Sequence, residues 1–415
     1  MLELTVLHYP FPFYIFPFLC GEKFIMTINL ENLRAEFQKI YHREPRFFCA
    51  PGRVNLIGEH TDYNGGFVLP MAIERGTTVA AAVREDREIR VRSVILNEAG
   101  EIDLDAPEQK LRGSWLDFVE GVARILERRD INLRGAELLI DSDVPSGAGL
   151  SSSAALEISV GLALTEISGK TIDKAQLALV GQAAEHEFVG AKVGIMDQYA
   201  SALGRKNHAL LIDCRSLEAE PIPLAMSDAA IVICDSKVKH KLTASEYNTR
   251  RAECEKAVEI LREFLPKITQ LRDVSIKDFE GYATHLPESI RKRCRHVVTE
   301  NERTLNAAEA LKKNDLTEFG RLMWLSHASL RDDFEVSCRE LDLLVEIASQ
   351  CEDVLGGRMT GGGFGGSTVN LVRRQSVENF TERISDEYRR QTNIEPAVYV
   401  SSPADGAKEL VNGNF

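Results

Sequence analysis

The sequence predicts an α+β protein of two domains, and three observations carry this prediction. The chain has 415 residues, which is long enough for two domains or more with a sizeable core. Strand-like runs recur in its first half, at residues 77–83, 89–96 and 136–141. Helical patterns then dominate residues 250–350.

The Pro-Ile-Pro stretch at residues 221–223 is the predicted domain boundary. It follows a strand-like run at residues 208–213 and precedes a buried strand at residues 229–234. We therefore expect an N-terminal domain over residues 26–220 and a C-terminal domain over residues 221–415.

The extreme N-terminus, residues 1–25, is predicted to be a poorly ordered extension. Residues 8–20 are apolar, yet they carry three prolines and lack a basic flank, so they fit neither a secretory signal nor a membrane span. Met26 is a second candidate start, and an amphipathic helix is predicted directly after it, over residues 30–41.

Bulk composition argues against two classes of partner. The formal net charge is −13, which argues against a general nucleic-acid partner or an anionic membrane surface. The eight cysteines are scattered without metal-ligand spacing, so reduced thiols in a cytoplasmic protein are expected. The sequence leaves the oligomeric state open and is compatible with a monomer.

A serine-rich loop at residues 144–153 is the first candidate site. The strand at residues 136–141 leads into Pro145, two glycines follow, and Ser151, Ser152 and Ser153 open a helix that is predicted to end near Ser168. Backbone N–H groups in the first turn of a helix lack partners and can bind an anion such as phosphate. The Walker lysine is absent, and simple serine capping is an equal alternative for this stretch taken alone.

A second candidate site lies at residues 48–70. Arg53, Glu59, His60 and Asp62 occur in a glycine-punctuated segment, with a short strand predicted at residues 54–57. Carboxylates accept hydrogen bonds from hydroxyl groups, so this cluster suits a polyhydroxylated ligand. A polar surface turn is the alternative. A metal site is the less favoured one, because no further histidine cluster lies nearby.

Three further segments carry candidate residues. Trp115 is predicted to start an amphipathic helix that runs through Glu127, and residues 174–189 are predicted to form a helix that contains Glu185. A glycine-bounded loop then leads to a short helix that contains Asp197. The helix dipole keeps such a carboxylate ionised, more so if Arg53 lies alongside, although capping is the commoner role of an aspartate there.

The glycine run at residues 357–366 formally matches a dinucleotide-binding fingerprint. A strand-like run follows it at residues 367–372, whereas that fingerprint must open a helix, so a dehydrogenase is excluded. We expect this glycine turn to pack against the serine loop, where side chains would obstruct phosphates.

Together these stretches resemble a known family. Residues 50–64, Ala-Pro-Gly-Arg-Val-Asn-Leu-Ile-Gly-Glu-His-Thr-Asp-Tyr-Asn, resemble the galactokinase signature of the GHMP small-molecule kinases. The serine loop resembles the phosphate-binding motif of that family, and residues 357–366 resemble its third motif. The resemblance extends from about Met26 to the C-terminus.

The resemblance implies a two-domain fold with the active site in the cleft between the domains. It implies transfer of a phosphoryl group from ATP to the anomeric hydroxyl of galactose, with Asp197 as base, Arg53 beside it, and Mg²⁺ held by Ser153 and Glu185. The sugar would contact Glu59, His60, Thr61, Asp62, Gly194 and Tyr247. ATP would contact Gly147, Ala148, Gly149, Leu150, Ser151, Ser152, Ser153 and Trp115.

Two alternatives and one departure from the family stay open. A related kinase acting on N-acetylgalactosamine or arabinose is one alternative, and a non-catalytic sensor of galactose and ATP is the other. The uninterrupted run at residues 151–155 disfavours the sensor. Asp235 stands where the family commonly has Asn, which weakens any assignment of a role to Ser236.

Overall fold

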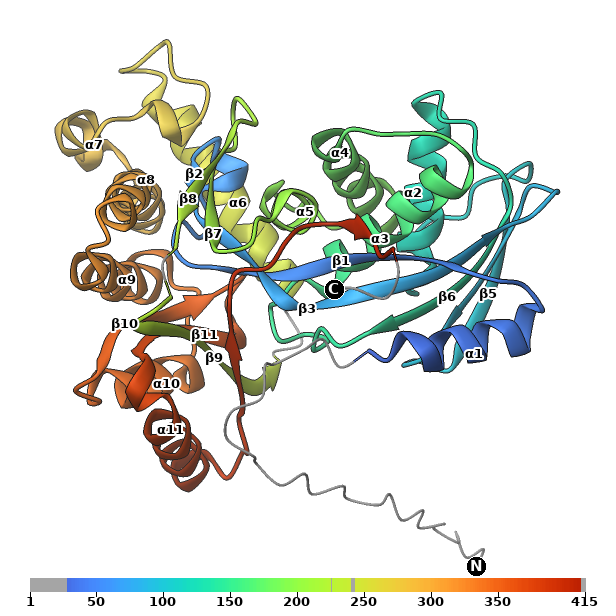
Figure 1. Cartoon of the computed structure of the whole chain (residues 1–415). Coiled ribbons are helices and arrows are strands. Elements are labelled where there is room, and N and C mark those ends of the chain that lie inside the picture. Colours follow the sequence, from blue (N-terminus) through green and yellow to red (C-terminus); the bar gives the residue numbers. More distant parts are fainter. Residues whose placement is uncertain (1–27, 225, 240–242, 412–415) are drawn as a thin grey trace, which may run out of the picture.

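Three β-sheets and the helices packed on them make up the fold (Figure 1). The computed structural model describes residues 28–224, 226–239 and 243–411. The predicted N-terminal extension, residues 1–25, lies outside the described residues. The mixture of helices and strands confirms the predicted α+β class.

The largest sheet has six strands in the order β13-β1-β3-β6-β4-β5. Their bounds are β1 (Arg46–Asn55), β3 (Pro70–Val83), β4 (Glu88–Ser93), β5 (Glu98–Asp103), β6 (Ala136–Ser142) and β13 (Lys408–Glu409). All neighbouring pairs are antiparallel except β4 and β6, which are parallel. Strand β13 comes from the C-terminal end of the chain and pairs with β1, the first strand of the chain, so segments from opposite ends of the described chain meet in this sheet.

Both faces of this sheet are covered, because successive side chains in a strand point to opposite faces. Phe47 packs in a cluster with α1 (Leu30–Tyr41), whereas its neighbour Phe48 packs in the cluster that contains α2 (Leu116–Arg128) and α3 (Ser152–Ile167). The central strands β1, β3 and β6 are therefore buried on both sides.

Several sequence predictions in this part are confirmed. The helix over residues 30–41 is α1, the helix from Trp115 is α2 with Trp115 at its N-cap, and the helix after the serines is α3. The helix predicted over residues 174–189 consists of α4 (Lys174–Ala184) and a π-helical turn, Glu185–Val189. The short helix at Asp197 is α5 (Met196–Leu203).

The short strand predicted at residues 54–57 is wrong in its bounds. The strand there is β1, which begins at Arg46 and ends at Asn55. Its pairing with β3 shifts register between Pro51 and Arg53, because a proline cannot donate to the ladder and is tolerated at such an irregularity. As a result Arg53 lies within the strand rather than before it.

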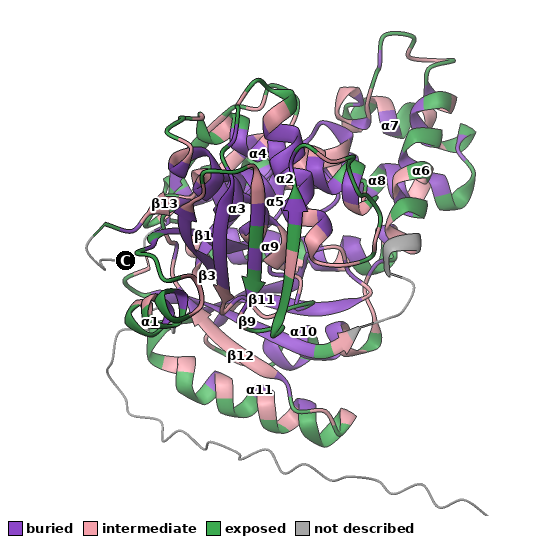
Figure 2. Ribbon diagram, turned by 90° about the vertical axis from the view of Figure 1, so that its right-hand side faces the viewer, coloured by how far each residue is buried: buried purple, intermediate pink, exposed green. Residues whose placement is uncertain are grey.

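A four-stranded sheet in the order β10-β11-β9-β12 organises the second half. Its strands are β9 (Ala229–Lys239), β10 (Val354–Thr360), β11 (Gly365–Arg373) and β12 (Ala397–Ser401). The helices of this half are α6 (Thr243–Leu261), α7 (Ile276–Tyr282), α8 (Glu288–Lys312), α9 (Leu316–Ser329), α10 (Arg339–Ser349) and α11 (Val377–Thr392). Figure 2 shows that α11 keeps an exposed outer face.

A small sheet, β2-β7-β8, lies beside α8 (Figure 1). Its strands are β2 (Phe67–Val68), β7 (His208–Asp213) and β8 (Ala219–Pro223). The proposed boundary at residues 221–223 thus forms part of a strand, and the division at residue 220 stays a prediction.

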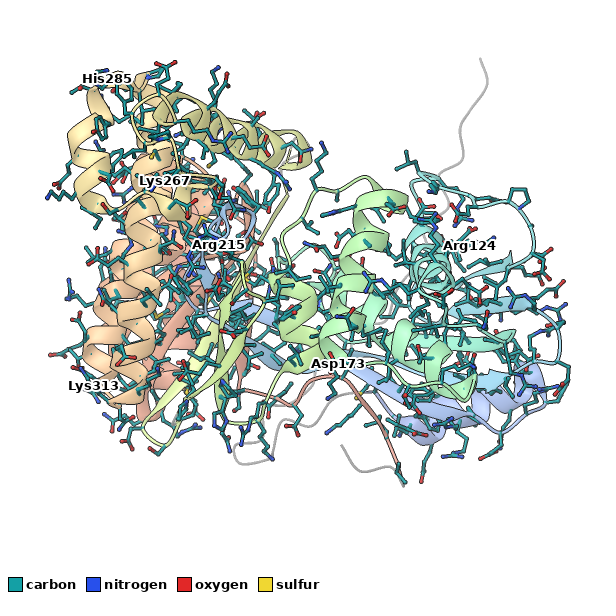
Figure 3. All side chains as sticks on the ribbon, turned by 90° about the horizontal axis from the view of Figure 1, so that it is seen from above. Arg124, Asp173, Arg215, Lys267, His285 and Lys313 are labelled. Atoms are coloured by element: carbon teal, nitrogen blue, oxygen red, sulfur yellow. The ribbon has the colours of Figure 1, made fainter. Side chains whose placement is uncertain are left out.

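One apolar core joins the two halves beneath the glycine-rich loops. It contains Val54 of β1, Leu150 of the serine loop, Ile231 of β9, Phe319 of α9 and Val369 of β11. Seen from above, Lys313 after α8 and His285 before it lie on one side of the molecule, and Arg124 of α2 lies on the other (Figure 3). The candidate site lies above this shared core.

Candidate active site

The segments singled out in the sequence converge on one cavity of about 290 Å³. It is lined by residues from β1 and the turn after it, from the serine loop and the start of α3, from α5 and the loop before it, from α6, and from the glycine turn. The lining residues are Arg53, Glu59, His60, Asp62, Gly147, Gly149, Leu150, Ser151, Ser152, Ser153, Val193, Gly194, Met196, Asp197, Tyr247, Gly361 and Gly362.

The serine loop curls into the N-terminus of α3. Gly147 and Gly149 have φ values of 73° and 74°, and Ser151, the N-cap residue, has a φ of 59°. This left-handed conformation is readily adopted by glycine and rarely by other residues. The unpaired N–H groups of the first turn and the positive end of the helix dipole therefore border the cavity, where they can bind phosphate oxygens.

The glycine turn between β10 and β11 packs against this loop, as the sequence predicts. A Cβ atom on Gly361 would lie 3.3 Å from the carbonyl oxygen of Gly149. The hydroxyl of Ser367 donates to the carbonyl oxygen of Ala148 at 2.7 Å. The carbonyl oxygen of Ala148 is therefore engaged by Ser367 at the glycine turn, and Ala148 is not among the lining residues.

Arg53 and Asp197 form a two-point ion pair in the cavity wall. The guanidinium donates from Nε to Oδ1 of Asp197 at 2.8 Å and from Nη2 to Oδ2 at 2.7 Å. Its third nitrogen, Nη1, donates to the carbonyl oxygen of Gly149 at 2.6 Å. The hydroxyl of Ser151 also donates to Asp197. These bonds fix the position of the Asp197 side chain. Because this side chain is 27% exposed, it is still accessible from the cavity.

Glu59 and His60 form the buried side of the cavity. Oε1 of Glu59 accepts from the N–H of Gly361 at 2.7 Å and from the hydroxyl of Thr360 at 3.2 Å. Arg358 lies 3.6 Å away and is fully buried. Burial raises the pKa of Glu59, an effect that Arg358 opposes.

The imidazole of His60 is held by its neighbours and presents one free nitrogen. Its Nδ1 lies 2.9 Å from the Tyr63 hydroxyl, and its ring packs against Phe334. Burial lowers the pKa of His60 to about 3, so the ring is neutral. Its Nε2 is buried and has no hydrogen-bond partner among the described residues. A polar group of a ligand would supply that partner.

Asp62 lies against Gly194 at the rim of the same pocket. A Cβ atom on Gly194 would lie only 1.6 Å from Oδ2 of Asp62, so the absence of a side chain makes room for the carboxylate. Burial, together with the charges of Asp197 and Glu59, raises the pKa of Asp62 to about 7. Tyr247 lies nearby, with its ring 5.4 Å from that of His60.

Glu185 forms a buried acidic pair with Glu157 of α3, and the two are joined through Gln198 of α5. The amide of Gln198 donates at 2.9 Å both to Oε2 of Glu185 and to Oε2 of Glu157. Burial and the charge of Asp197 raise the pKa of Glu185 to about 7. Glu157 follows Ser153 by one turn on the same face of α3, which places the Ser153 hydroxyl beside this acidic region.

These residues fit a magnesium ion by the chemistry of their donors. Mg²⁺ prefers hard oxygen ligands and keeps several waters, and Ser153 and Glu185 offer a hydroxyl and a carboxylate. Within the described part of the chain, no group of three or more His, Cys, Asp or Glu side chains could hold a metal by itself. A cation here would therefore need oxygens from a nucleotide as well.

Four predicted site residues do not line the cavity: Thr61, Trp115, Ala148 and Glu185. The hydroxyl of Thr61 donates to the carbonyl oxygens of Gly58 and Phe67 and so holds the turn together. The indole of Trp115 donates to Glu98 at 2.8 Å. Its position near adenine stays a prediction.

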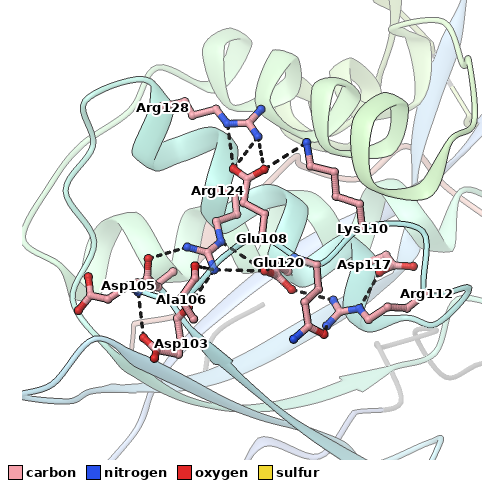
Figure 4. A network of polar contacts seen from close by, with 12 residues as sticks. Asp103, Asp105, Ala106, Glu108, Lys110, Arg112, Asp117, Glu120, Arg124 and Arg128 are labelled. Atoms are coloured by element: carbon pink, nitrogen blue, oxygen red, sulfur yellow. Dashed lines mark hydrogen bonds and ion pairs between the residues drawn. The ribbon is translucent and has the colours of Figure 1, made fainter.

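The segment before Trp115 is fixed by an ion-pair network around α2 (Figure 4). Arg124 donates to the carbonyl oxygens of Asp103, Leu104 and Ala106, and Arg112 pairs with the buried Asp117. This network orders the chain where it leaves β5 and enters α2.

Sequence reasoning missed four residues of or around the site. Val193 and Met196 line the cavity, while Glu157 and Gln198 support Glu185. Glu157 had one available signal, since it is a buried acid within a largely apolar stretch of α3. The other three residues carried none.

Comparison with known proteins identifies the family. The galactokinase galactose-binding signature matches residues 35–83, and the N-terminal and C-terminal GHMP kinase domains match residues 117–205 and 307–390. Galactokinases of Chloroflexus aurantiacus and Chloroflexus aggregans are each 51% identical over 373 residues, which cover 89% of this chain and 95% of each relative. This chain belongs to the galactokinase family.

Solved structures agree with this family membership. The galactokinase of Lactococcus lactis, whose crystal structure contains galactose, superposes with a TM-score of 0.89 at 38% identity and covers 92% of this chain and 100% of its own. The mevalonate kinase of Methanococcus jannaschii superposes with a TM-score of 0.64 at 18% identity, which shows the shared fold alone. The predicted GHMP kinase fold, with its N- and C-terminal domains, is thereby confirmed.

Proposed function

We propose that this chain transfers the γ-phosphoryl group of ATP to the anomeric hydroxyl of α-D-galactose, which gives galactose 1-phosphate and ADP. The observation that carries this proposal is the position of the Arg53–Asp197 pair. It lies in one cavity between a phosphate-binding helix N-terminus and a turn with two carboxylates and an unpaired imidazole nitrogen. Family membership supports the choice of galactose.

The sugar occupies the side formed by Glu59, His60, Asp62 and Tyr247. Glu59 and Asp62 accept hydrogen bonds from sugar hydroxyls, and Nε2 of His60 gains the partner that it lacks. Tyr247 and the adjoining rings supply an apolar surface for the sugar. Gly194 leaves space for the Asp62 carboxylate, and Thr61 holds the turn from behind.

Asp197 accepts the proton of the anomeric hydroxyl as its oxygen attacks the γ-phosphorus. The bond from that phosphorus to the β,γ-bridging oxygen breaks, and ADP leaves. Arg53 and Ser151 both donate to Asp197, so its carboxylate is fixed in orientation before the substrate binds. The Arg53 charge also lies where it can stabilise the transferred phosphoryl group.

ATP phosphates lie on the backbone of residues 147–153, at the N-terminus of α3. Ser153 and Glu185 would hold Mg²⁺ on this side of the cavity. When bound, Mg²⁺ neutralises charge on the phosphate oxygens and orients them for transfer. Trp115 is proposed to lie near the adenine end.

The cellular setting is proposed from the cysteines and the charge. All seven cysteines in the described part of the chain are free, which supports a cytoplasmic protein. No helix among the described residues is long and apolar enough to cross a bilayer. The partners are proposed to be the small molecules galactose and ATP, with neither nucleic acid nor membrane.

The proposal is tested by measuring ADP release from the purified full chain with a panel of free sugars. We expect the highest kcat/KM with galactose over glucose, arabinose and N-acetylgalactosamine, and a phosphorus NMR spectrum of the product that shows a 1-phosphate. Faster turnover of another sugar would change the substrate. Binding of galactose and ATP without turnover would replace the enzyme with a sensor.

A further inference from the structure

One face of α8 is polar and yet completely buried. His296, Glu300 and Thr304 follow one another at intervals of four residues, so they lie on the same side of the helix, and each has no exposed surface. Charged residues are rarely buried unless they have partners. The partners of this face therefore indicate what it does.

This face of α8 is hydrogen-bonded to the backbone of the turn at residues 58–62, which carries Glu59, His60 and Asp62. Oε1 of Glu300 accepts from the N–H of Gly58 at 3.0 Å. Nε2 of His296 lies 3.1 Å from the carbonyl oxygen of Glu59. Next to this face, Oδ1 of Asn301 accepts from the N–H of Phe67 at 3.0 Å. Three backbone groups around the turn are thus satisfied by α8, more than 230 residues away in sequence.

The turn has a backbone that requires such support. Gly58 has a φ of 95°, and His60, which is not a glycine, has a φ of 62°. Glycine adopts such a conformation readily, whereas a non-glycine residue such as His60 keeps it only where the surrounding structure holds it. A Cβ atom on Gly58 would lie 2.6 Å from the carbonyl oxygen of Phe67 and 2.9 Å from the Thr304 hydroxyl, so the turn and α8 are in close contact.

Glu300 is itself held rigidly as an anion. Arg303 donates to its Oε2 at 2.7 Å, and Ser326 donates to its Oε1. Although burial acts to raise its pKa, the cations Arg303 and Arg358 bring the pKa down to about 2. A charged acceptor makes a stronger bond to a backbone N–H than a neutral one does.

We infer that Glu300 is a positioning residue for sugar binding, which fixes Glu59, His60 and Asp62 through the backbone of Gly58. This inference rests on the proposed function, because it assigns the turn to the sugar. It makes α8, which lies in the C-terminal half, part of the sugar site without any contact to the substrate. A buried ion pair that serves stability alone is the competing explanation.

The two explanations differ in steady-state kinetics. In Glu300→Gln the side chain keeps its size but loses one of its two acceptor oxygens and its charge. We expect the KM for galactose to rise about tenfold, with kcat at saturating galactose and the KM for ATP unchanged, because only ground-state sugar positioning is lost. Glu302→Gln, on the exposed face of the same helix, is the matched control and should show wild-type values.

A lower melting temperature of Glu300→Gln with wild-type galactose KM would overturn the inference. So would a fall in kcat with both KM values unchanged. If Glu300→Gln does not fold, Ser326→Ala decides instead: it keeps the charge and removes one donor to Glu300, and an unchanged galactose KM there would overturn the inference. Failure of the proposed function is distinguishable, because the wild-type protein would then not turn over galactose.

Discussion

The contact between Gly194 and Asp62 gives a sharp test of the sugar site. In Gly194→Ala the new methyl group would overlap with the Asp62 carboxylate, since the ideal Cβ lies 1.6 Å from Oδ2. The φ of Gly194 is not in the left-handed region, so alanine introduces no strain of its own backbone. The carboxylate must therefore rotate away from its place in the cavity.

The magnitude follows from the bond that this rotation breaks. Hydrogen bonds to charged groups contribute about 1.5–3 kcal/mol, and the low end of this range corresponds to roughly a tenfold loss of affinity. We expect the KM for galactose to rise by about this factor, while the KM for ATP stays unchanged. Steady-state kinetics with each substrate varied in turn provides the measurement.

Gly281→Ala is the matched control for this variant. Gly281 lies in α7, and a Cβ atom there would meet nothing within 4 Å. We expect wild-type kinetics from the control. A wild-type galactose KM in Gly194→Ala would refute the assignment of Asp62 to the sugar, because the carboxylate cannot keep its place beside the added methyl group.

Three further predictions concern the same cavity. The pKa of Asp62 is raised to about 7, so its carboxylate is mostly ionised at pH 8 and mostly protonated at pH 6. The galactose KM should therefore rise roughly fivefold as the pH falls from 8 to 6, and it should not change with pH in Asp62→Asn. Ser153→Ala or Glu185→Gln should raise the Mg²⁺ concentration for half-maximal rate roughly tenfold, and a metal titration with unchanged midpoints in both would exclude these ligands. Arg53→Lys cannot form the two-point contact with Asp197, so kcat should fall about 10²-fold in initial-rate assays, and a wild-type kcat would show that a simple charge suffices.

Local patterns in the sequence were sufficient for much of the fold. The amphipathic pattern at residues 30–41 and the strand-like run at residues 208–213 correspond in their bounds to α1 and β7. The serine loop and the glycine turn were placed together correctly, because glycines mark positions where backbones must approach closely.

Other features could not be read from the sequence, for physical reasons. The predicted strand was shorter than β1 because Pro51 and Gly52 are typical of turns. That β1 continues through them depends on its pairing with β3, whose register shifts at this point. The bond from Glu300 to Gly58 spans 242 residues and has no local pattern. The pairing of β13 with β1 likewise brings together opposite ends of the chain.

The central claim, that Asp197 accepts the proton of the sugar hydroxyl, is tested most directly by Asp197→Asn in a single-turnover experiment. Asparagine keeps the shape of the side chain but cannot take up the proton. With enzyme in excess over radiolabelled ATP and galactose saturating, rapid quenching measures the chemical step alone. We predict that its rate falls about 10²- to 10⁴-fold while calorimetry shows that galactose and ATP still bind. A near-normal rate of phosphoryl transfer in this variant would contradict the account.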